Sequence, residues 1–496
     1  MKTTPVPVLI CSSAVVVLLC AGAAPALADG PGAPTASAPA AAEGGGVGGG
    51  SLAPAPSEPF AWGDFTWLNG NNRQHAALLD GKYFTGSFLA DVNYVWDWAH
   101  PIDHTIVGST ATFRTGEFNL SFLSAGGDFH WENARGRIML QLGTRAMGIA
   151  RNDASADRGQ FDLRDALRYI TEAYGGYHWD VLHGINLDAG IFLSYIGLFS
   201  YENFENWAYQ PSFTSDNTPW FFHGARLQIF PTDRLKVELW LINGFQAYAQ
   251  FNHMPGLGFQ VAYRPEEWVA MVFNGYGGLD TTPLTTPGDR SGRVRLHSDN
   301  SLLVRYYNKP GAMFSKAAFS ITGDIGVESG AGVTPFGGGT GGTTPGGCGA
   351  AGQQACTQNF ISAMIYNRFW FLNDKFATTV GGGFIHNPGR YLVLPPTGAA
   401  NPFNPANLHA FPMNPGDPFN GWDISGGIQF MPNEYVTWVL EFVHRHASVP
   451  YFAGHGGVTS ATGYFQSNPN SFGDPNYVPD LRNDENRINL AMLTRF

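Results

Sequence analysis

The sequence has little charge and little cysteine, and it has no long apolar run after its first residues. Charged residues make up 14% of the 496 residues, and acids outnumber lysine plus arginine by 39 to 28, which gives a formal net charge of −11. A general nucleic-acid binder needs basic stripes, so we predict no nucleic-acid partner. A membrane-spanning helix needs about twenty apolar residues in a row, and no such stretch follows the amino terminus.

The motifs of the common enzyme and metal classes are also absent. Two glycine tracts, Gly44–Gly50 and Gly337–Gly347, lack the Lys-Ser/Thr pair that a phosphate loop needs. The sequence contains no HExxH, no nucleophile elbow and no CxxC pair. We therefore predict that the protein is not an enzyme and uses no cofactor or metal. A hydrolase remains the less favoured alternative, because its site needs Ser or an acid, His and an orienting acid in register on neighbouring strands, and no such triad can be named in this sequence.

The amino terminus reads as a secretory signal followed by a spacer. Lys2 precedes an apolar run over residues 6–19, and Ala26-Leu27-Ala28 is a small-x-small cleavage site. We predict a signal peptide over residues 1–28 and export from the cytoplasm. Residues 29–59 are rich in Ala, Gly and Pro, which is typical of a flexible tether. From residue 60 to residue 496 the pattern is uniform, so we expect one domain there.

The four cysteines divide into two pairs. Cys11 and Cys20 lie in the predicted signal peptide, whereas Cys348 and Cys356 lie in a Gly/Thr-rich stretch. Disulfides form in the oxidising compartments that exported proteins reach. We therefore predict a disulfide between Cys348 and Cys356.

Apolar and polar residues alternate along most of the domain. At the carboxy terminus, Ile488, Leu490 and Met492 fall on one face of a strand and Asn489 and Arg495 on the other, because a strand sends successive side chains to opposite faces. The pattern recurs about sixteen times. Each such strand has one apolar face and one wetter face.

Short and long connections alternate between these strands. Short turns with Pro, Asn or Asp are expected at 231–234, 264–267, 373–375 and 431–434. Longer connections are expected at 96–117, 150–168, 198–218, 247–255, 278–297, 328–357, 387–420 and 447–486. Short periplasmic turns and long outer loops are typical of a transmembrane barrel. We predict an all-β, antiparallel up-and-down barrel of about 16 strands.

The wetter face of each strand must line the barrel interior, because an Arg or Lys facing the middle of the bilayer costs about 2–4 kcal/mol. Sixteen strands leave an interior too wide for side chains to fill, which predicts an aqueous channel. An alternative for each charge is that it pairs with a neighbour and only hydrates the wall. The predicted pore-lining residues are Arg137, Arg145, Glu172, Asp188, Arg226, Lys236, Glu238, Arg305, Lys316, Asp324, Arg368, Asp423, Glu441, Arg445 and Arg495.

The third long connection, residues 200–220, is both aromatic and acidic. An exposed loop gains little from many aromatic side chains, so we predict that it folds into the lumen and narrows the pore. Packing on the outer rim is the alternative. The residues expected at the constriction are Glu202, Glu205, Trp207, Tyr209 and Asp216.

Several short motifs occur in a characteristic order along the domain. They are Tyr83-Phe84-Thr85, Pro101-Ile102-Asp103-His104-Thr105, Gly126-Gly127-Asp128-Phe129, Arg135-Gly136-Arg137, Tyr201-Glu202-Asn203-Phe204-Glu205-Asn206-Trp207 and Leu241-Ile242-Asn243-Gly244-Phe245. Over residues 60–496 the chain resembles the β-barrel porins of the OmpL-like type. This resemblance implies an outer-membrane pore without catalytic residues. The tether and the cysteine-bearing loop are not part of that pattern.

The expected function is that of an outer-membrane porin, through which small hydrophilic solutes and ions diffuse passively. The expected partners are outer-membrane lipid and these solutes or ions. Homo-oligomers such as trimers are common among barrels of this kind, and no stripe in the sequence demonstrates one. A surface barrel used for binding or adhesion is the main alternative, because eight sizeable loops are expected.

Overall fold

The computed structural model describes residues 59–496 apart from 151–152, 154, 156–159, 251, 281–293, 331–355, 388–418 and 460–478. The chain divides into two compact units, Met1–Ala55 and Pro56–Phe496. All the described residues belong to the second unit.

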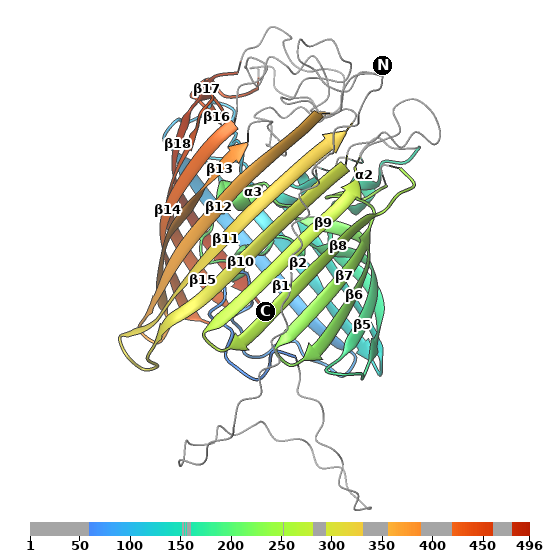
Figure 1. Cartoon of the computed structure of the whole chain (residues 1–496). Helices are drawn as coiled ribbons and strands as arrows, with labels where there is room; N and C mark the ends of the chain where they lie inside the picture. The colour runs from blue at the N-terminus through green and yellow to red at the C-terminus, as the bar shows by residue number, and fades with distance from the viewer. Residues whose placement is uncertain are drawn as a thin grey trace, which may run out of the picture. The chain divides into compact units, whose positions relative to one another are not determined.

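Sixteen strands form a closed antiparallel barrel (Figure 1). In chain order they are β1 (Phe84–Asp97), β2 (Phe118–Trp131), β3 (Ala134–Leu142), β4 (Ile170–Trp179), β5 (Ile185–Leu193), β6 (Phe221–Thr232), β7 (Leu235–Ile242), β8 (Gly256–Glu266), β9 (Val269–Leu279), β10 (Val294–Asn308), β11 (Phe314–Gly330), β12 (Cys356–Phe371), β13 (Phe376–Asn387), β14 (Phe419–Asn433), β15 (Val436–Ala447) and β18 (Asp484–Arg495). Each strand pairs with its neighbours in sequence. The last strand pairs with the first, from Leu89 opposite Arg495 to Asp97 opposite Arg487. The predicted all-β barrel of sixteen strands is confirmed.

The remaining elements are short and lie in the connections. They are α1 (Thr144–Gly148), α2 (Leu163–Leu167), the 3-10 turn η2 (Asn203–Glu205), α3 (Phe213–Asp216) and a two-stranded sheet of β16 (Phe452–Ala453) with β17 (Leu481–Arg482). None of the helices in the described residues has the length and apolar character that crossing a bilayer requires.

The connections alternate in length as expected. Those at one end of the barrel, such as 233–234 between β6 and β7 and 434–435 between β14 and β15, contain only a few residues. Those at the other end, such as 98–117 and 194–220, are much longer. We call these the short-turn end and the long-loop end.

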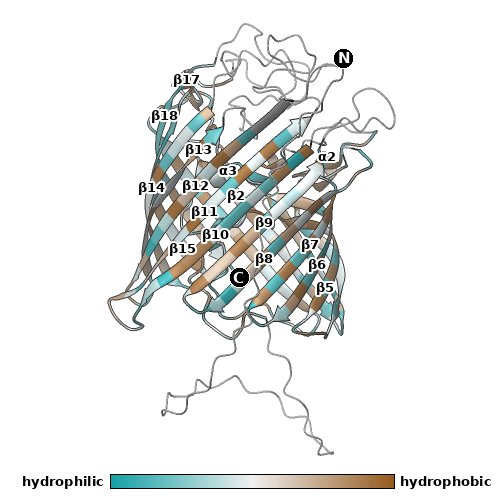
Figure 2. Ribbon diagram, in the orientation of Figure 1, coloured by the Kyte–Doolittle hydropathy of each residue, from teal (hydrophilic) through white to brown (hydrophobic). Residues whose placement is uncertain are grey.

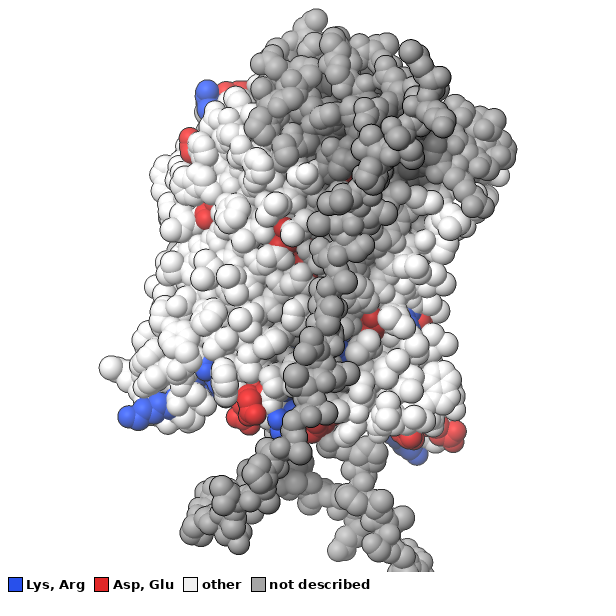
Figure 3. All heavy atoms as spheres, viewed as in Figure 1, with Lys and Arg blue, Asp and Glu red and all other residues white. Residues whose placement is uncertain are grey.

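The two faces of the wall differ as the alternation predicts. On β18, Leu490 is 47% exposed on the outside, whereas its neighbour Asn489 is fully buried on the inside. Hydrophobic and hydrophilic residues alternate along the strands (Figure 2). Where the wall is visible in Figure 3, charged side chains gather at the short-turn end and the surface between the rims is mostly uncharged. An apolar outer band suits contact with lipid.

Two segments that are not part of the wall fill much of the interior. The first, residues 194–220 between β5 and β6, is the inward loop, and its Trp207, Tyr209 and Phe213 are all buried. The second, residues 59–80 before β1, is the N-terminal segment, and its Phe65 and Trp67 are buried too. The largest hydrophobic cluster joins residues of both segments to wall residues. The main core of the molecule therefore lies inside the barrel.

Candidate functional site: the barrel interior

Acidic side chains of the inward loop pair with arginines of the wall. Asp216 Oδ2 lies 2.7 Å from Arg445 Nη2 of β15, and both side chains are buried. Arg495 Nη1 of β18 lies 2.8 Å from Glu202 Oε2 and 2.5 Å from Glu205 Oε1. The loop thus brings negative charge to positions where the wall supplies positive charge. All five residues are among those the sequence pointed to.

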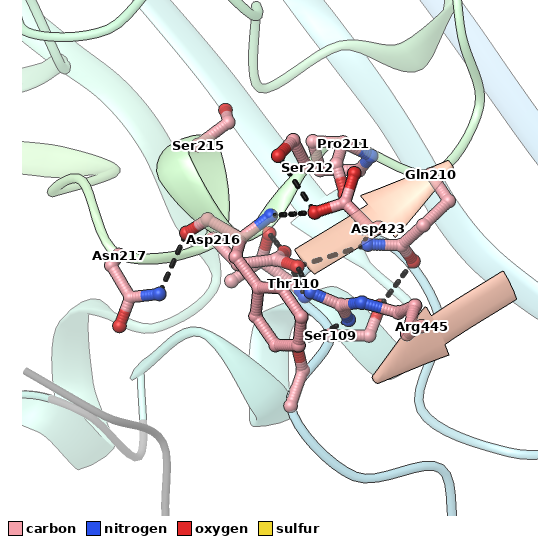
Figure 4. Close-up of polar contacts among 12 residues, drawn as sticks. Ser109, Thr110, Gln210, Pro211, Ser212, Ser215, Asp216, Asn217, Asp423 and Arg445 are labelled. Atoms are coloured by element: carbon pink, nitrogen blue, oxygen red, sulfur yellow. Dashed lines mark hydrogen bonds and ion pairs between the residues drawn. The ribbon is translucent and has the colours of Figure 1, made fainter. Parts of the chain in front are cut away.

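Wall carboxylates hold the backbone of the same loop. Glu441 of β15 accepts hydrogen bonds from the backbone N–H groups of Tyr209 and Gln210, each at 2.9 Å. Asp423 of β14 accepts from the Phe213 N–H at 2.9 Å and from the Ser212 hydroxyl at 2.8 Å (Figure 4). A backbone group buried away from water needs a partner, and the wall provides one. These contacts fix the loop in one conformation.

Other wall groups complete this anchoring. Arg368 Nη1 of β12 donates to the Trp207 carbonyl at 3.0 Å. On β1, Asp91 accepts from the Tyr209 hydroxyl at 2.6 Å and from Asn203 Nδ2 at 2.9 Å. The loop therefore leaves the wall between β5 and β6, crosses the interior and is held on strands β1, β12, β14, β15 and β18.

Part of the connection 98–117, which follows β1, lies against the inward loop. Thr110 donates to Asp216 Oδ1 through its backbone N–H at 2.9 Å and through its hydroxyl at 2.6 Å (Figure 4). Arg445 Nη1 also donates to the carbonyl of Gly108 at 2.7 Å. The Asp216 carboxylate therefore accepts hydrogen bonds from Thr110 of this connection, from Gln210 of its own loop and from Arg445 of β15.

Six of the predicted pore-lining charges form ion pairs on strands β2 to β7. Arg137 bridges Asp128 and Glu172, each at 2.5 Å. Asp188 lies 3.0 Å from Arg226 and 3.2 Å from Arg135. Lys236 and Glu238 are 2.7 Å apart. These residues follow the alternative weighed for each charge, because each has a neighbour of opposite sign.

Three further predicted residues have partners outside these strands. Arg305 of β10 lies 3.6 Å from Asp64 and 3.5 Å from Glu267. Lys316 of β11 lies 2.7 Å from Asp374.

Asp324, also on β11, is fully buried with His297 Nε2 at 3.0 Å. Asp324 therefore contributes to the packed wall and not to a water-exposed lining.

The alternation predicts Arg145 on a strand, but the structure does not place it on one. Strand β3 ends at Leu142, and Arg145 follows in helix α1. Gly143, at φ 108°, turns the chain out of the sheet. The Arg145 side chain still reaches the interior, where its Nη2 donates to Asn203 Oδ1 at 2.9 Å. The Arg145 side chain therefore supports the inward loop and does not project from a strand of the wall.

Sequence reasoning missed some wall residues that also face inward. Arg487 of β18 is fully buried and hydrogen-bonds Gln210 Oε1 of the inward loop. Asp91 is buried and holds Tyr209. The signal for Arg487 was present, because it shares a strand face with Asn489 and Arg495.

The two interior segments also contact each other. The Trp207 backbone N–H donates to Asn69 Oδ1 at 2.7 Å, and Trp207 Nε1 donates to the Trp67 carbonyl at 3.0 Å. The Gly70 N–H donates to the Glu205 carbonyl at 3.1 Å. The inward loop is thus anchored by the wall and by the N-terminal segment.

A cavity of about 260 Å³ lies among these elements. The inward loop contributes Tyr195, Tyr201 and Trp220, and the N-terminal segment contributes Asn69 and Asn71. Strands β7 to β10 contribute Lys236, Gln260 and Arg264, among others. Drug-sized ligands occupy pockets of roughly 300–1,000 Å³, so this cavity suits water, ions or a small solute.

The predicted disulfide falls outside the described residues. Cys348 lies in an undescribed range, and Cys356 opens β12 with a side chain that is not described. Among the residues that the structure does describe, no group of three or more His, Cys, Asp or Glu side chains is arranged to hold a metal ion.

Comparison with known proteins gives one family match and several distant structural likenesses. The family described as "Putative beta-barrel porin-2, OmpL-like" matches residues 83–472. A comparison with curated proteins finds no match. OmpT of Vibrio cholerae, folded in vitro, aligns over 85% of this chain and 100% of its own, with 9% identity and a TM-score of 0.44. An anion-selective porin from Comamonas acidovorans aligns over 83% and 99%, with 8% identity and a TM-score of 0.44.

Proposed function

The chain belongs to the beta-barrel porin-2, OmpL-like family and is therefore an outer-membrane porin, and we propose that its inward loop sets the size of the pore. Small hydrophilic solutes and ions diffuse passively through the space that the loop leaves open. The observation that carries this proposal is the loop's position inside a closed barrel, held by wall charges such as Arg445 and Glu441.

The charged residues on strands β3 to β7, across the lumen from the loop anchors on β14, β15 and β18, support a water-filled path. The side chains of Arg137, Glu172, Arg226 and Lys236 keep between 14% and 20% of their surface accessible. Ionic groups are costly to bury unless they are paired and hydrogen-bonded, and these remain partly hydrated. We place the permeation path beside the ion pairs of strands β3 to β7, across the lumen from the loop anchors on β14, β15 and β18. The loop borders this path, because Tyr201 bonds to Gln141 of β3 and Tyr195 stacks on Trp240 of β7.

Conductance measurements test the role of the loop. Purified protein in a planar bilayer should conduct ions, and liposomes that contain it should swell in the smallest sugars faster than in larger ones. Deleting residues 203–215 should raise single-channel conductance, because it removes Trp207, Tyr209 and Phe213 from the lumen. Deleting the glycine tract 337–347 serves as the control. Equal conductance in the chain with and without residues 203–215 contradicts the proposed constriction.

The same measurements separate the alternatives. A barrel used only for binding or adhesion passes neither ions nor sugars, and a hydrolase cleaves lipid or peptide substrates in a direct assay. We propose that no bond is made or broken, because the interior charges form structural ion pairs and loop anchors.

The remaining parts of the proposal concern export and assembly. We propose that residues 1–28 are a signal peptide, that residues 29–59 form a tether, and that Cys348 and Cys356 form a disulfide. Mass spectrometry of the mature protein, with and without reduction, tests the cleavage site and the disulfide. We further propose a homotrimer, which light scattering of the detergent-solubilised protein tests.

A further inference from the structure

The N-terminal segment crosses the short-turn end of the barrel from one side to the other. On one side, the Phe60 N–H donates to the Asp233 carbonyl at 2.8 Å, in the turn between β6 and β7. On the other side, His75 Nδ1 lies 2.6 Å from Glu434 Oε1, in the turn between β14 and β15. In the closed order of sixteen strands these two turns are eight strand positions apart. They are therefore diametrically opposite, so the chain between them must span the mouth.

Aromatic side chains hold the first half of the segment. The guanidinium groups of Arg234 and Arg264 lie over the rings of Trp62 and Phe60, at 4.2 and 4.3 Å from the ring centroids. Trp67 is almost fully buried, and its Nε1 donates to the Glu267 carbonyl at 3.0 Å. A cation over an aromatic face contributes about 0.5–1 kcal/mol at an exposed site and more when it is desolvated. This half is therefore docked and is not a loose leader.

Polar side chains hold the second half. Arg73 donates through Nη2 to the Val436 carbonyl at 3.1 Å and through Nη1 to the Phe204 carbonyl at 3.4 Å. Gln74 Nε2 donates to the Arg495 carbonyl at 3.0 Å. These contacts reach the ends of β15 and β18 and the underside of the inward loop. The segment thus bonds to the rim and to the inward loop at the same time.

One glycine marks how closely the segment and the loop approach. Gly70 has φ 72°, a conformation that favours glycine. A Cβ atom at this position would lie 2.2 Å from the carbonyl oxygen of Leu198 in the inward loop. Any larger residue at position 70 must therefore push the two segments apart.

We propose that the N-terminal segment is a periplasmic plug that partly closes the pore and braces the inward loop from below. It limits flow while docked, and its release widens the path to the periplasm. This inference rests on the proposed function, because a plug restricts flow only in a barrel that conducts. It goes further in assigning a gate to residues that precede the first strand.

A deletion tests the plug directly. Residues 59–76 are removed and residues 77–83 are kept, because the Leu79 carbonyl and the Asp80 carboxylate bond to Gly86 and Thr85 of β1. We expect at least a twofold rise in single-channel conductance. Removal of residues 36–53, an equal length of the tether, is the control and should leave conductance unchanged. Equal conductance in the plug deletion and the full chain overturns the inference and leaves the proposed function standing.

A point variant and a protease give a second readout that does not depend on conductance. In the full chain, Arg73 should resist trypsin, because its side chain is engaged with two carbonyls. Gly70→Val should expose Arg73 to cleavage and raise conductance. Gly311→Val, at φ 79° in an open turn between β10 and β11 with no atom near its Cβ position, is the matched control. Rapid cleavage at Arg73 in the folded full chain overturns the plug. A barrel that conducts nothing, with or without residues 59–76, overturns the plug and the proposed function together.

Discussion

Asp216 of the inward loop and Arg445 of β15 form an ion pair of 2.7 Å with neither side chain open to solvent. The guanidinium also lies 3.9 Å from the centroid of the Phe213 ring. A buried pair gains little over a well-packed apolar pair, because both charges lose their hydration. Removing one partner lowers stability strongly, because the other charge is then left buried without a counter-charge. The pair therefore contributes more to the position of the loop than to the total stability of the fold.

The first prediction follows from this asymmetry. Arg445→Ala should lower the free energy of unfolding by about 3–5 kcal/mol, because Asp216 is left without its cation. The double variant Arg445→Met with Asp216→Asn should recover much of that loss. Arg482→Ala removes a partly exposed pair with Asp480 and should cost about 0–1 kcal/mol. Denaturant titration of the protein refolded into lipid vesicles measures all three. A double variant as unstable as Arg445→Ala contradicts the argument.

The wall of the barrel could be predicted from the sequence, because the alternation of residues within each strand decides which side chains face inward. Alternation along β18 places Asn489 inside and Leu490 outside, and nothing elsewhere in the chain alters that. The burial of aromatic residues in the inward loop could be predicted for the same reason, because Trp207 and Tyr209 need apolar surroundings.

The contents of the lumen could be predicted only in part. Glu441 binds two backbone N–H groups of the inward loop and does not line open water. These contacts join residues that are 231 and 232 positions apart in the chain. Periodicity carries no information on such pairs. The spacing of Arg145 continues the β3 pattern and predicts a strand position, whereas the turn at Gly143 ends that strand. The N-terminal segment has no strand pattern, so its place at the barrel mouth had no sequence signal beyond its aromatic residues.

The second prediction concerns acid release of the N-terminal segment. Burial raises the pKa of Glu434, but hydrogen bonds from His75 and the charge of Arg73 outweigh it, so the pKa lies below its ordinary value of 4.5. Burial also raises the pKa of Asp64, while hydrogen bonds from Thr66 and the nearby Lys316 and Arg305 lower it below 3.8 overall. A carboxyl whose folded pKa is depressed stabilises the fold above its unfolded pKa and loses that contribution as pH falls through the folded value.

The Glu434 end of the segment should therefore begin to loosen below about pH 4.5 and the Asp64 end below about pH 3.8, and both ends should remain docked above pH 4.5. Hydrogen exchange of residues 60–76, compared at pH 5 and pH 3.5 after correction for intrinsic rates, measures the change. Glu434→Gln should exchange faster at pH 5 and respond less to acid, because it cannot titrate. Exchange that is equally slow at both pH values in the full chain contradicts the prediction.

The third prediction concerns the ion selectivity of the permeation path beside strands β3 to β7. Arg137 bridges Asp128 and Glu172, so Arg137→Gln leaves two carboxylates without their cation. A pore lined by one sign of charge concentrates ions of the opposite sign. We expect the cation-to-anion permeability ratio to rise by roughly twofold in Arg137→Gln and to fall in Glu172→Gln. Reversal potentials in a salt gradient measure both. Shifts of the same sign in the two variants contradict the assignment of this region to the path.

The last prediction tests which face of the wall meets lipid. Leu490 lies on the outer face of β18 and is 47% exposed, whereas Val181 lies in a short turn between β4 and β5. Leu490→Arg should cost about 2–4 kcal/mol if its position is near the middle of the bilayer, and Val181→Arg about 0–1 kcal/mol, because the cost of a charge falls toward the interface. Unfolding from lipid vesicles measures the difference directly. In detergent the two costs should converge, because micelles deform around a charge more easily than a bilayer does. Equal costs in vesicles would place Leu490 away from hydrocarbon and remove the basis for separating the lipid face from the lumen face.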